Sequence, residues 1–183
     1  MRTFARMLAT LVALSLSVPA AALAAGAITS VEGMTSTIFQ HGQSSFSGIG
    51  LRVQVHPTQL IQNVTLMPTL EYWRNTSNIS SFGIESTRKD ATMGVDARYD
   101  FPHQGLRPYV GAGIALHFLS NRVDAPSLGL NDATDSTIKG GLSLLGGVTF
   151  GIAGKLSNLI ELKYHHVPDQ SQLKINWGLS YGL

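Results

Sequence analysis

The sequence contains no cysteine. This absence excludes disulfide bonds, and it also excludes a lipoprotein, whose lipid is attached to a cysteine at the signal cleavage site. After residue 25 the chain also lacks any apolar run close to the ~20 residues that a membrane-spanning helix requires. A helical membrane protein is therefore excluded. Only a closed barrel of strands would then pair every backbone polar group inside a bilayer.

The first 25 residues have the three parts of a secretory signal peptide. Arg2 and Arg6 form a positive beginning, residues 7–18 are apolar, and Ala22-Leu23-Ala24 is a small-x-small cleavage site. The apolar part is too short to remain as a membrane anchor, which would need ~20 residues. We therefore predict a signal peptide at residues 1–25 and export of the remainder.

The mature chain, residues 26–183, has no excess of charge of either sign. The whole sequence has 13 Lys and Arg against 11 Asp and Glu. Removal of Arg2 and Arg6 with the signal leaves 11 against 11. The basic isoelectric point of about 9.0 therefore reflects the signal and indicates no nucleic-acid partner. The length predicts one domain, and no motif predicts a cofactor.

What the chain does have is alternation, most clearly from Gln172 to Leu183. Side chains point to opposite faces of a strand with a period of two. One face of this segment would be small or polar, and the other would be entirely apolar or aromatic. We expect the apolar face to contact lipid. Its residues are Leu173, Ile175, Trp177, Leu179, Tyr181 and Leu183.

The same alternation predicts eight strands, of which the first rests mainly on the strand count. The predicted strands are residues 27–40, 46–56, 63–74, 90–101, 106–119, 137–152, 158–167 and 172–183. Pro68 lacks a backbone donor and predicts a bulge or a local break. The polar segments 75–89 and 120–136 are interpreted as long loops, and the other connections are short. Short turns on the side of the termini and longer loops outside are typical of outer-membrane barrels. The predicted fold is all-β, an eight-stranded antiparallel up-and-down transmembrane β-barrel.

Charged residues of the predicted strands fall on the polar face. A Lys or Arg on the lipid face costs about 2–4 kcal/mol near the middle of the bilayer, so their exclusion from the apolar face is expected. An eight-stranded barrel has an interior that side chains just fill, and we predict a charge network there, with His117 as a further interior residue. The network residues are Arg52, Glu71, Asp96, Arg98, Asp100, Lys139, Glu161, Lys163 and Lys174.

Aromatic residues lie near the ends of the predicted strands, which is the distribution of two interfacial girdles. One girdle would contain Tyr72, Trp73 and Phe118, and the other Tyr99, Phe101, Tyr109, Phe150 and Tyr181.

Three stretches resemble the small eight-stranded outer-membrane proteins of Gram-negative bacteria, the OmpA-barrel, OmpX-like and opacity-type group. They are Arg107-Pro-Tyr-Val-Gly-Ala-Gly-Ile-Ala-Leu, Glu161-Leu-Lys-Tyr and Asn176-Trp-Gly-Leu-Ser-Tyr-Gly-Leu183. The last resembles the terminal insertion signal that the outer-membrane assembly machinery reads, with Asn176, Gly178, Tyr181 and Leu183 at its key places. Family members usually end in Phe, and this chain ends in Leu183.

The resemblance implies a location in the outer membrane of a Gram-negative bacterium, and we expect a monomer. Its partners would be outer-membrane lipid and lipopolysaccharide, and the assembly machinery during insertion. The resemblance covers nearly the whole mature chain, but its motifs support fold and location better than any activity.

The candidate catalytic residues are His165, His166 and Ser171. A serine nucleophile requires a base within hydrogen-bonding reach, and the sequence does not establish that contact. Lipid A deacylases are barrels whose histidine and serine lie near the last strands in a motif resembling His-x-Ser-Asn. Here His165 is followed by His166, Val167 and Pro168, so that motif is incomplete. Adjacent residues on a strand point to opposite faces, so the two histidines would not share a metal. We expect no catalytic activity and no metal site.

The expected role is structural or adhesive, through the external loops, because scaffolds carry variable function on loops. Three alternatives remain open from the sequence. The first is a narrow, porin-like channel. The second is a lipid hydrolase that uses His165 or His166. The third is a soluble periplasmic barrel, with the apolar face turned inward around a lipid.

Overall fold

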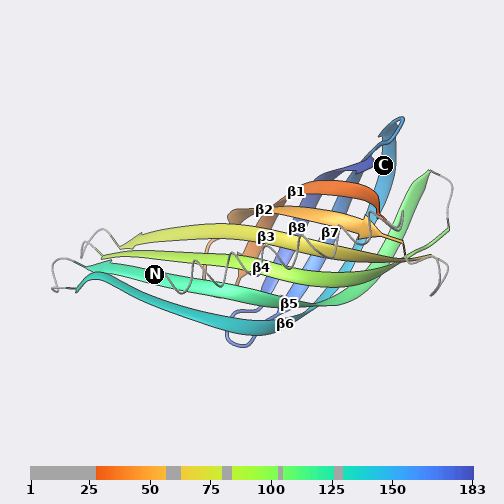
Figure 1. The fold of residues 1–183 in the computed structure, drawn as a ribbon. Coiled ribbons are helices and arrows are strands. Elements are labelled where there is room, and N and C mark those ends of the chain that lie inside the picture. The colour runs from red at the N-terminus through yellow and green to blue at the C-terminus, as the bar shows by residue number, and fades with distance from the viewer. Residues whose placement is uncertain (1–27, 57–62, 80–83, 103–104, 126–129) are drawn as a thin grey trace.

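The computed structural model describes residues 28–56, 63–79, 84–102, 105–125 and 130–183. The predicted signal peptide lies outside this range. Eight strands form a closed antiparallel barrel in which each strand pairs with the next and β1 pairs with β8 (Figure 1). The strands are β1 (Ile28–Gln40), β2 (Phe46–Val55), β3 (Val64–Ile79), β4 (Ile84–Asp100), β5 (Leu106–Ala125), β6 (Leu130–Ala153), β7 (Leu156–His166) and β8 (Gln172–Gly182).

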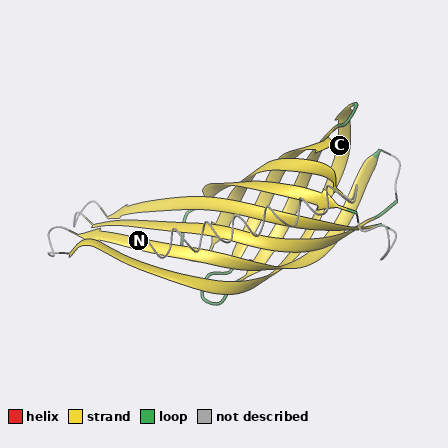
Figure 2. Ribbon diagram, in the orientation of Figure 1, coloured by secondary structure: helices red, strands yellow, loops and turns green. Residues whose placement is uncertain are grey.

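The described residues are strands and their connections, without a helix (Figure 2). Within them, accordingly, no helix is long and apolar enough to cross a membrane. The predicted eight-stranded fold is confirmed, including the weakly marked first strand. β1 closes the barrel through an unbroken antiparallel register that runs from Ser30 opposite Gly182 to Gln40 opposite Gln172.

Pro68 interrupts the pairing of β3 on one side only. Between β2 and β3 the paired positions pass from Arg52–Thr69 directly to Val55–Leu66, and the register on either side of the gap is the same. On its other side β3 stays paired with β4, with Pro68 opposite Val95. Pro68 therefore causes the predicted local break, because it lacks a ladder donor, but the unchanged register means that no bulge forms.

Strands β3 to β6 are longer than the sequence predicted. β3, β4, β5 and β6 contain 16, 17, 20 and 24 residues, whereas the other strands contain 10 to 13. The interpretation of residues 75–89 and 120–136 as loops is therefore wrong for residues 75–79, 84–89, 120–125 and 130–136, which are strands, and residues 80–83 and 126–129 lie outside the described structure. These segments carry Ser, Thr and Asn where the barrel carries apolar residues, so the hydrophobic alternation stops although the ladder continues. Thr76 and Thr87, for example, are opposite each other with their hydroxyl oxygens 3.1 Å apart.

The two ends of the barrel have different connections. β1 begins and β8 ends at one end, which we call the turn end. Its three connections are residues 56–63, 101–105 and 154–155. At the opposite end, which we call the hairpin end, the β3–β4 and β5–β6 hairpins project far past the other strands (Figure 1). Outer-membrane barrels have short periplasmic turns, so we expect the turn end to be on the periplasmic side of a barrel of that class.

Apolar side chains face outward around the barrel. They include Ile49, Leu51, Ile114, Leu142, Leu144, Leu162 and Trp177, all of which are exposed. The alternative of a soluble barrel with an inward apolar face is therefore wrong. The outward face is an apolar band suited to lipid, while most buried side chains are polar or charged.

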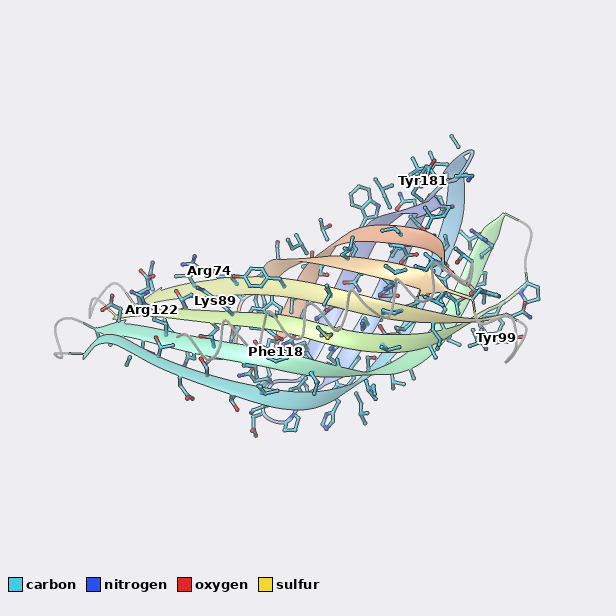
Figure 3. The ribbon with its side chains drawn as sticks, viewed as in Figure 1. Arg74, Lys89, Tyr99, Phe118, Arg122 and Tyr181 are labelled. Atoms are coloured by element: carbon cyan, nitrogen blue, oxygen red, sulfur yellow. The ribbon has the colours of Figure 1, made fainter. Side chains whose placement is uncertain are left out.

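Two of the predicted girdle residues lie inside the barrel instead. Trp73 and Tyr109 are 2% and 1% exposed. Both lie near strand ends, but their places in the alternation belong to the inward face, and this decides their position. Gly147 makes room for the Tyr109 ring, because a Cβ atom there would lie 2.7 Å from Tyr109 Cζ. Phe118 is also buried, and Phe150 is half-buried. Tyr72, Tyr99, Phe101 and Tyr181 are exposed, and Tyr99 and Tyr181 lie toward the turn end (Figure 3).

Candidate functional site

The centre of the barrel contains an arginine between two carboxylates. Arg52 on β2 donates to both carboxylate oxygens of Glu161 on β7, at 2.8 and 3.0 Å, and lies 3.4 Å from Glu32 on β1. Tyr109 and Asn176 also donate to Glu161, at 3.0 and 2.8 Å. Arg52, Glu32 and Glu161 are almost completely buried. The cluster links β1, β2, β5, β7 and β8 across the middle of the barrel interior.

A second charge cluster lies beside the first. Lys163 is 2.7 Å from Asp96 and 3.1 Å from Glu71, and Lys174 also pairs with Glu71. Ser143 donates to the other oxygen of Asp96. Buried charges are tolerated when they are paired and hydrogen-bonded in this way. The cluster contains two cations and two carboxylates, so its formal charge is balanced.

The structure places most of the predicted network inside. Arg52, Glu71, Asp96, Arg98, Glu161, Lys163 and Lys174 are buried. Asp100 and Lys139 lie at opposite ends of the barrel and are partly exposed; Asp100 pairs with Arg98, and Lys139 pairs with the turn residue Asp169. Sequence reasoning missed Glu32 and Asp90, both completely buried. Their places in the period-two alternation were the available signal, although around Glu32 the Ser and Thr residues on both faces obscured it.

A chain of imidazoles lies nearer the hairpin end. His117 Nδ1 is 2.8 Å from Asp90 and 3.0 Å from the Thr92 hydroxyl, and its Nε2 is 3.2 Å from His165 Nδ1. His165 is buried and His166 is exposed, so the adjacent histidines point to opposite faces. Among the described residues, no group of three or more His, Cys, Asp or Glu side chains is arranged to hold a metal ion. The His117–His165 pair is part of the packed interior.

Apolar side chains cover the His117–His165 pair at the hairpin end. Ile38, Trp73 and Val167 are buried, and the rings of Phe46 and Trp73 lie 4.7 Å apart. A Cβ atom at Gly141 would lie 3.0 Å from both His117 and Val167, which places Val167 beside the imidazoles. The interior is therefore closed by packed apolar groups at the end that carries the long hairpins.

The turn end instead opens into a polar cavity of about 470 Å³. All eight strands contribute residues to its lining, including Ser30, Arg98, Arg107, Thr149 and Ser157. We call this space the turn-end cavity.

The serine and histidine that the sequence singled out meet on the outside of the barrel. Ser171 Oγ lies 3.3 Å from His166 Nδ1, at the hairpin end of β7 and β8. His166 and Pro168 border an outward groove of about 540 Å³ whose remaining lining is apolar residues and glycine. Asp169 pairs with Lys139, so in the described part of the chain no carboxylate is hydrogen-bonded to His166. The pair has two members of a catalytic triad and lacks the third.

The four residues of the predicted insertion signal divide between the two faces of β8. Asn176 is buried and bonded to Ser36 and Glu161. Gly178 faces inward, where a Cβ atom would lie 2.8 Å from the Gly33 carbonyl oxygen. Tyr181 and Leu183 are exposed on the outward face. In the folded barrel, the polar and glycine positions are required for packing, and their recognition during insertion stays a prediction.

The family model for the outer membrane protein β-barrel domain matches residues 8–182. The chain belongs to this family. It is therefore an outer-membrane protein, and its apolar outward band is the surface that faces lipid. Comparison with curated protein sequences gives no match.

Solved structures of small outer-membrane barrels share the fold. Neisserial surface protein A is 20% identical, with a TM-score of 0.59, and the match covers 86% of this chain and 97% of that one. Ail of Yersinia pestis is 13% identical, with a TM-score of 0.58 and the same coverage. A major outer membrane protein of Thermus thermophilus is 12% identical, with a TM-score of 0.66, covering 85% of this chain and 99% of that one. These identities support the fold alone.

Proposed function

We propose that this protein is a non-enzymatic, surface-interaction barrel whose working part is the sheet that projects at the hairpin end. The observation that carries the proposal is the length of β3 to β6, which continue as a four-stranded sheet after β1, β2, β7 and β8 have ended (Figure 1). A stable barrel does not need this extension. Its role is therefore binding rather than spanning, and it lies on the side opposite the periplasmic turns.

The projecting sheet has two unpaired edges. The β6–β7 ladder begins at Leu142 opposite His166, so residues 130–141 of β6 have no strand on that side within the described structure. The β2–β3 ladder ends at Gly48 opposite Trp73, which leaves residues 74–79 of β3 similarly open. Unpaired strand edges bind extended segments of other proteins through backbone hydrogen bonds. The partner we propose is an extended protein segment outside the cell.

Lipopolysaccharide is the second partner that we propose. Arg74 on β3 and Lys89 on β4 are exposed and directly opposite each other, and Arg122 on β5 lies nearer the hairpin tip (Figure 3). Like charges in directly opposed positions repel each other, and a phosphate between Arg74 and Lys89 would relieve that repulsion. The outward apolar residue Tyr72 is two positions before Arg74 on the same strand, which places the basic pair just beyond the lipid-facing band.

Adhesion of whole bacteria tests the main proposal. The protein is produced in a host strain that lacks it, and bacteria bound to epithelial cell layers and to immobilised extracellular-matrix protein are counted. A shortened variant replaces residues 76–87 and 122–134 with two-residue Asn-Gly turns, which join the paired residues Asn75 and Arg88, and Asn121 and Asp135. We expect the full-length protein to raise adhesion and the shortened variant to lose the gain.

Heat-modified gel mobility in the outer-membrane fraction shows whether the shortened barrel still folds. Equal adhesion by the two folded proteins would contradict the proposal. The lipopolysaccharide contact is tested separately, by titrating the purified protein with lipopolysaccharide. Arg74→Gln with Lys89→Gln should weaken binding, whereas Lys139→Gln, which removes a hairpin-end cation already paired with Asp169, should leave it unchanged. Equal weakening by Lys139→Gln would indicate general attraction by positive charge.

The contact between His166 and Ser171 favours a second candidate, a hydrolase of outer-leaflet lipid. A general base within reach of a serine hydroxyl, beside an apolar groove, is the arrangement that acyl transfer requires. The missing carboxylate is why we rank this activity below surface binding. Mass spectrometry of lipid A from cells that produce wild type, His166→Ala or Ser171→Ala decides it. Deacylated lipid in wild type alone would establish the hydrolase, and unchanged lipid in all three would exclude it.

A narrow channel receives less support, because paired side chains occupy the lumen of an eight-stranded barrel. Conductance in planar bilayers tests this directly, and we expect none above the background of the empty bilayer.

A further inference from the structure

The turn-end cavity contains polar atoms that no protein group satisfies. Ser30 Oγ, Thr149 Oγ1 and Arg98 Nη1 are buried and have no hydrogen-bond partner. They belong to β1, β6 and β4, so the three strands bring separate unsatisfied groups to one cavity. Buried polar atoms nearly always have a partner. Water or a ligand in this cavity would satisfy these three groups.

Arg98 has partners for two of its guanidinium nitrogens within the protein. Its Nε and Nη2 atoms contact the two oxygens of Asp100, at 3.1 and 3.0 Å. This pairing balances the one carboxylate of the lining. Its Nη1 lies 3.9 Å from Glu32, beyond hydrogen-bonding reach, and remains as a free donor.

Two further cations line the cavity and are not balanced. Arg107 on β5 is directly opposite Thr149 on β6, and Lys155 lies in the turn between β6 and β7. Neither forms an ion pair with any residue in the described ranges. The turn-end cavity therefore has two unpaired positive charges in addition to a balanced Arg98–Asp100 pair.

Hydroxyl groups also line the turn-end cavity. Ser157 on β7 is directly opposite Ser180 on β8, and both line the same space, as does Thr149. Hydroxyls are both donors and acceptors and bind either phosphate oxygens or the hydroxyls of a sugar or glycerol. At about 470 Å³ the cavity exceeds what a single phosphate group fills. Its lining therefore suits an oxyanion attached to a small polyhydroxylated group.

We propose that the turn-end cavity is a binding site for a phosphate ester of a small polyol, entered from the periplasm. Arg107 and Lys155 hold the phosphate, Thr149 and Arg98 Nη1 donate to its oxygens, and Ser157 and Ser180 contact the polyol. The same chemistry has two sources, a soluble phosphate ester and the phosphoglycerol headgroup of a lipid in the periplasmic leaflet. The site is independent of the proposed surface function, because it lies at the opposite end of the barrel.

Calorimetric titration with glycerol 1-phosphate and with inorganic phosphate tests the site, using the complete refolded barrel in zwitterionic detergent. We expect saturable binding of glycerol 1-phosphate. Arg107→Gln or Lys155→Gln should weaken binding about tenfold each, since a charge-assisted hydrogen bond contributes about that much. The double variant should show a loss of about a hundredfold. Lys139→Gln, which removes a cation at the hairpin end, is the matched control and should bind normally.

Gel mobility with and without boiling confirms that each variant is folded, which is expected because both cations lie at the mouth of the barrel. The titration is then repeated in nanodiscs of phosphatidylcholine and of phosphatidylglycerol. Competition in phosphatidylglycerol alone would identify the lipid headgroup as the ligand, and equal binding in both would identify a soluble ester. No saturable binding by the folded wild type, or equal binding by the double variant, would overturn the proposal.

Discussion

The two ends of the barrel interior have opposite chemistry. At the hairpin end, Ile38, Trp73 and Val167 pack over the buried pair His117–His165. At the turn end, no large apolar side chain among the described residues lines the cavity, and hydroxyls, amides, cations, an imidazole and a carboxylate face it instead. The same closed sheet is therefore covered by packed side chains at one end and opens into a polar cavity at the other, according to which residues occupy the inward positions.

The charged groups in the middle of the barrel and the hydroxyls at the turn end differ in their partners. In the middle, charged groups such as Arg52 and Lys163 are paired with other protein groups. At the turn end, Ser30 and Thr149 have no protein partner. Substitutions that remove polar groups should therefore be costly in the first region and nearly neutral in the second. The following predictions test this contrast through the free energy of unfolding by urea in detergent.

The largest loss in the free energy of unfolding should come from Arg52→Met. Removal of the guanidinium group leaves Glu161 and Glu32 buried without the cation that both contact. Breaking a buried ion pair by removing one partner costs about 3–5 kcal/mol. Adding Glu161→Gln to the variant should recover part of the loss, because one of the unpaired charges is then removed. A loss below about 1 kcal/mol, the size typical of an exposed pair, would show that water reaches the middle of the barrel.

Trp73→Ala should cost somewhat less, about 3 kcal/mol, at the low end of the range for removing a buried aromatic side chain. Trp73 packs against Phe46 but also borders a small pocket of about 180 Å³, so its surroundings are not completely filled. Phe46→Leu is the milder companion change and should follow the same direction with a smaller loss. Unaltered stability in Trp73→Ala would mean that the hairpin end is not closed by packing.

Lys139→Met should have a small effect, below about 1 kcal/mol, because exposed ion pairs contribute little. Lys139 contacts Asp169 and the Pro168 carbonyl oxygen in the turn before β8, and Asp169 is largely exposed. The variant measures how much an exposed ion pair at the hairpin end contributes to the free energy of unfolding. A loss as large as that of Arg52→Met would mean that this turn is needed to hold β7 and β8 together.

Period-two alternation predicted the strands of the barrel wall and the inward side of most charges, because lipid enforces an apolar outward face. The alternation does not predict the strands where their outward face no longer contacts lipid. Beyond the membrane, β3 to β6 continue with Ser, Thr and Asn on both faces, so residues 75–89 and 120–136 resembled loops. Trp73 and Tyr109 differ from the prediction for another reason, since a position near a strand end indicates an interfacial girdle only for a residue on the outward face.

The partners within the interior could not be predicted from the sequence. Arg52 and Glu161 are 109 residues apart and meet across the lumen between β2 and β7. Their contact depends on the tilt and stagger of all eight strands, which alternation does not specify. For the same reason the sequence indicated neither the turn-end cavity nor the contact between His166 and Ser171, whose side chains meet only after the strand ends are fixed.

Thr149→Val should change the free energy of unfolding least. It is also the substitution that tells most about the turn-end cavity. The hydroxyl of Thr149 has no protein partner, so its removal breaks no bond within the protein. If the turn-end cavity contains water or a ligand, solvent satisfies the hydroxyl, and stability should change by less than about 0.5 kcal/mol. If the cavity were dry, the hydroxyl would be an unsatisfied buried group costing about 1–3 kcal/mol, and the isosteric valine would stabilise the barrel by a comparable amount. A marked stabilisation would therefore make the two ends of the interior alike and would remove the basis for a polar binding site at the turn end.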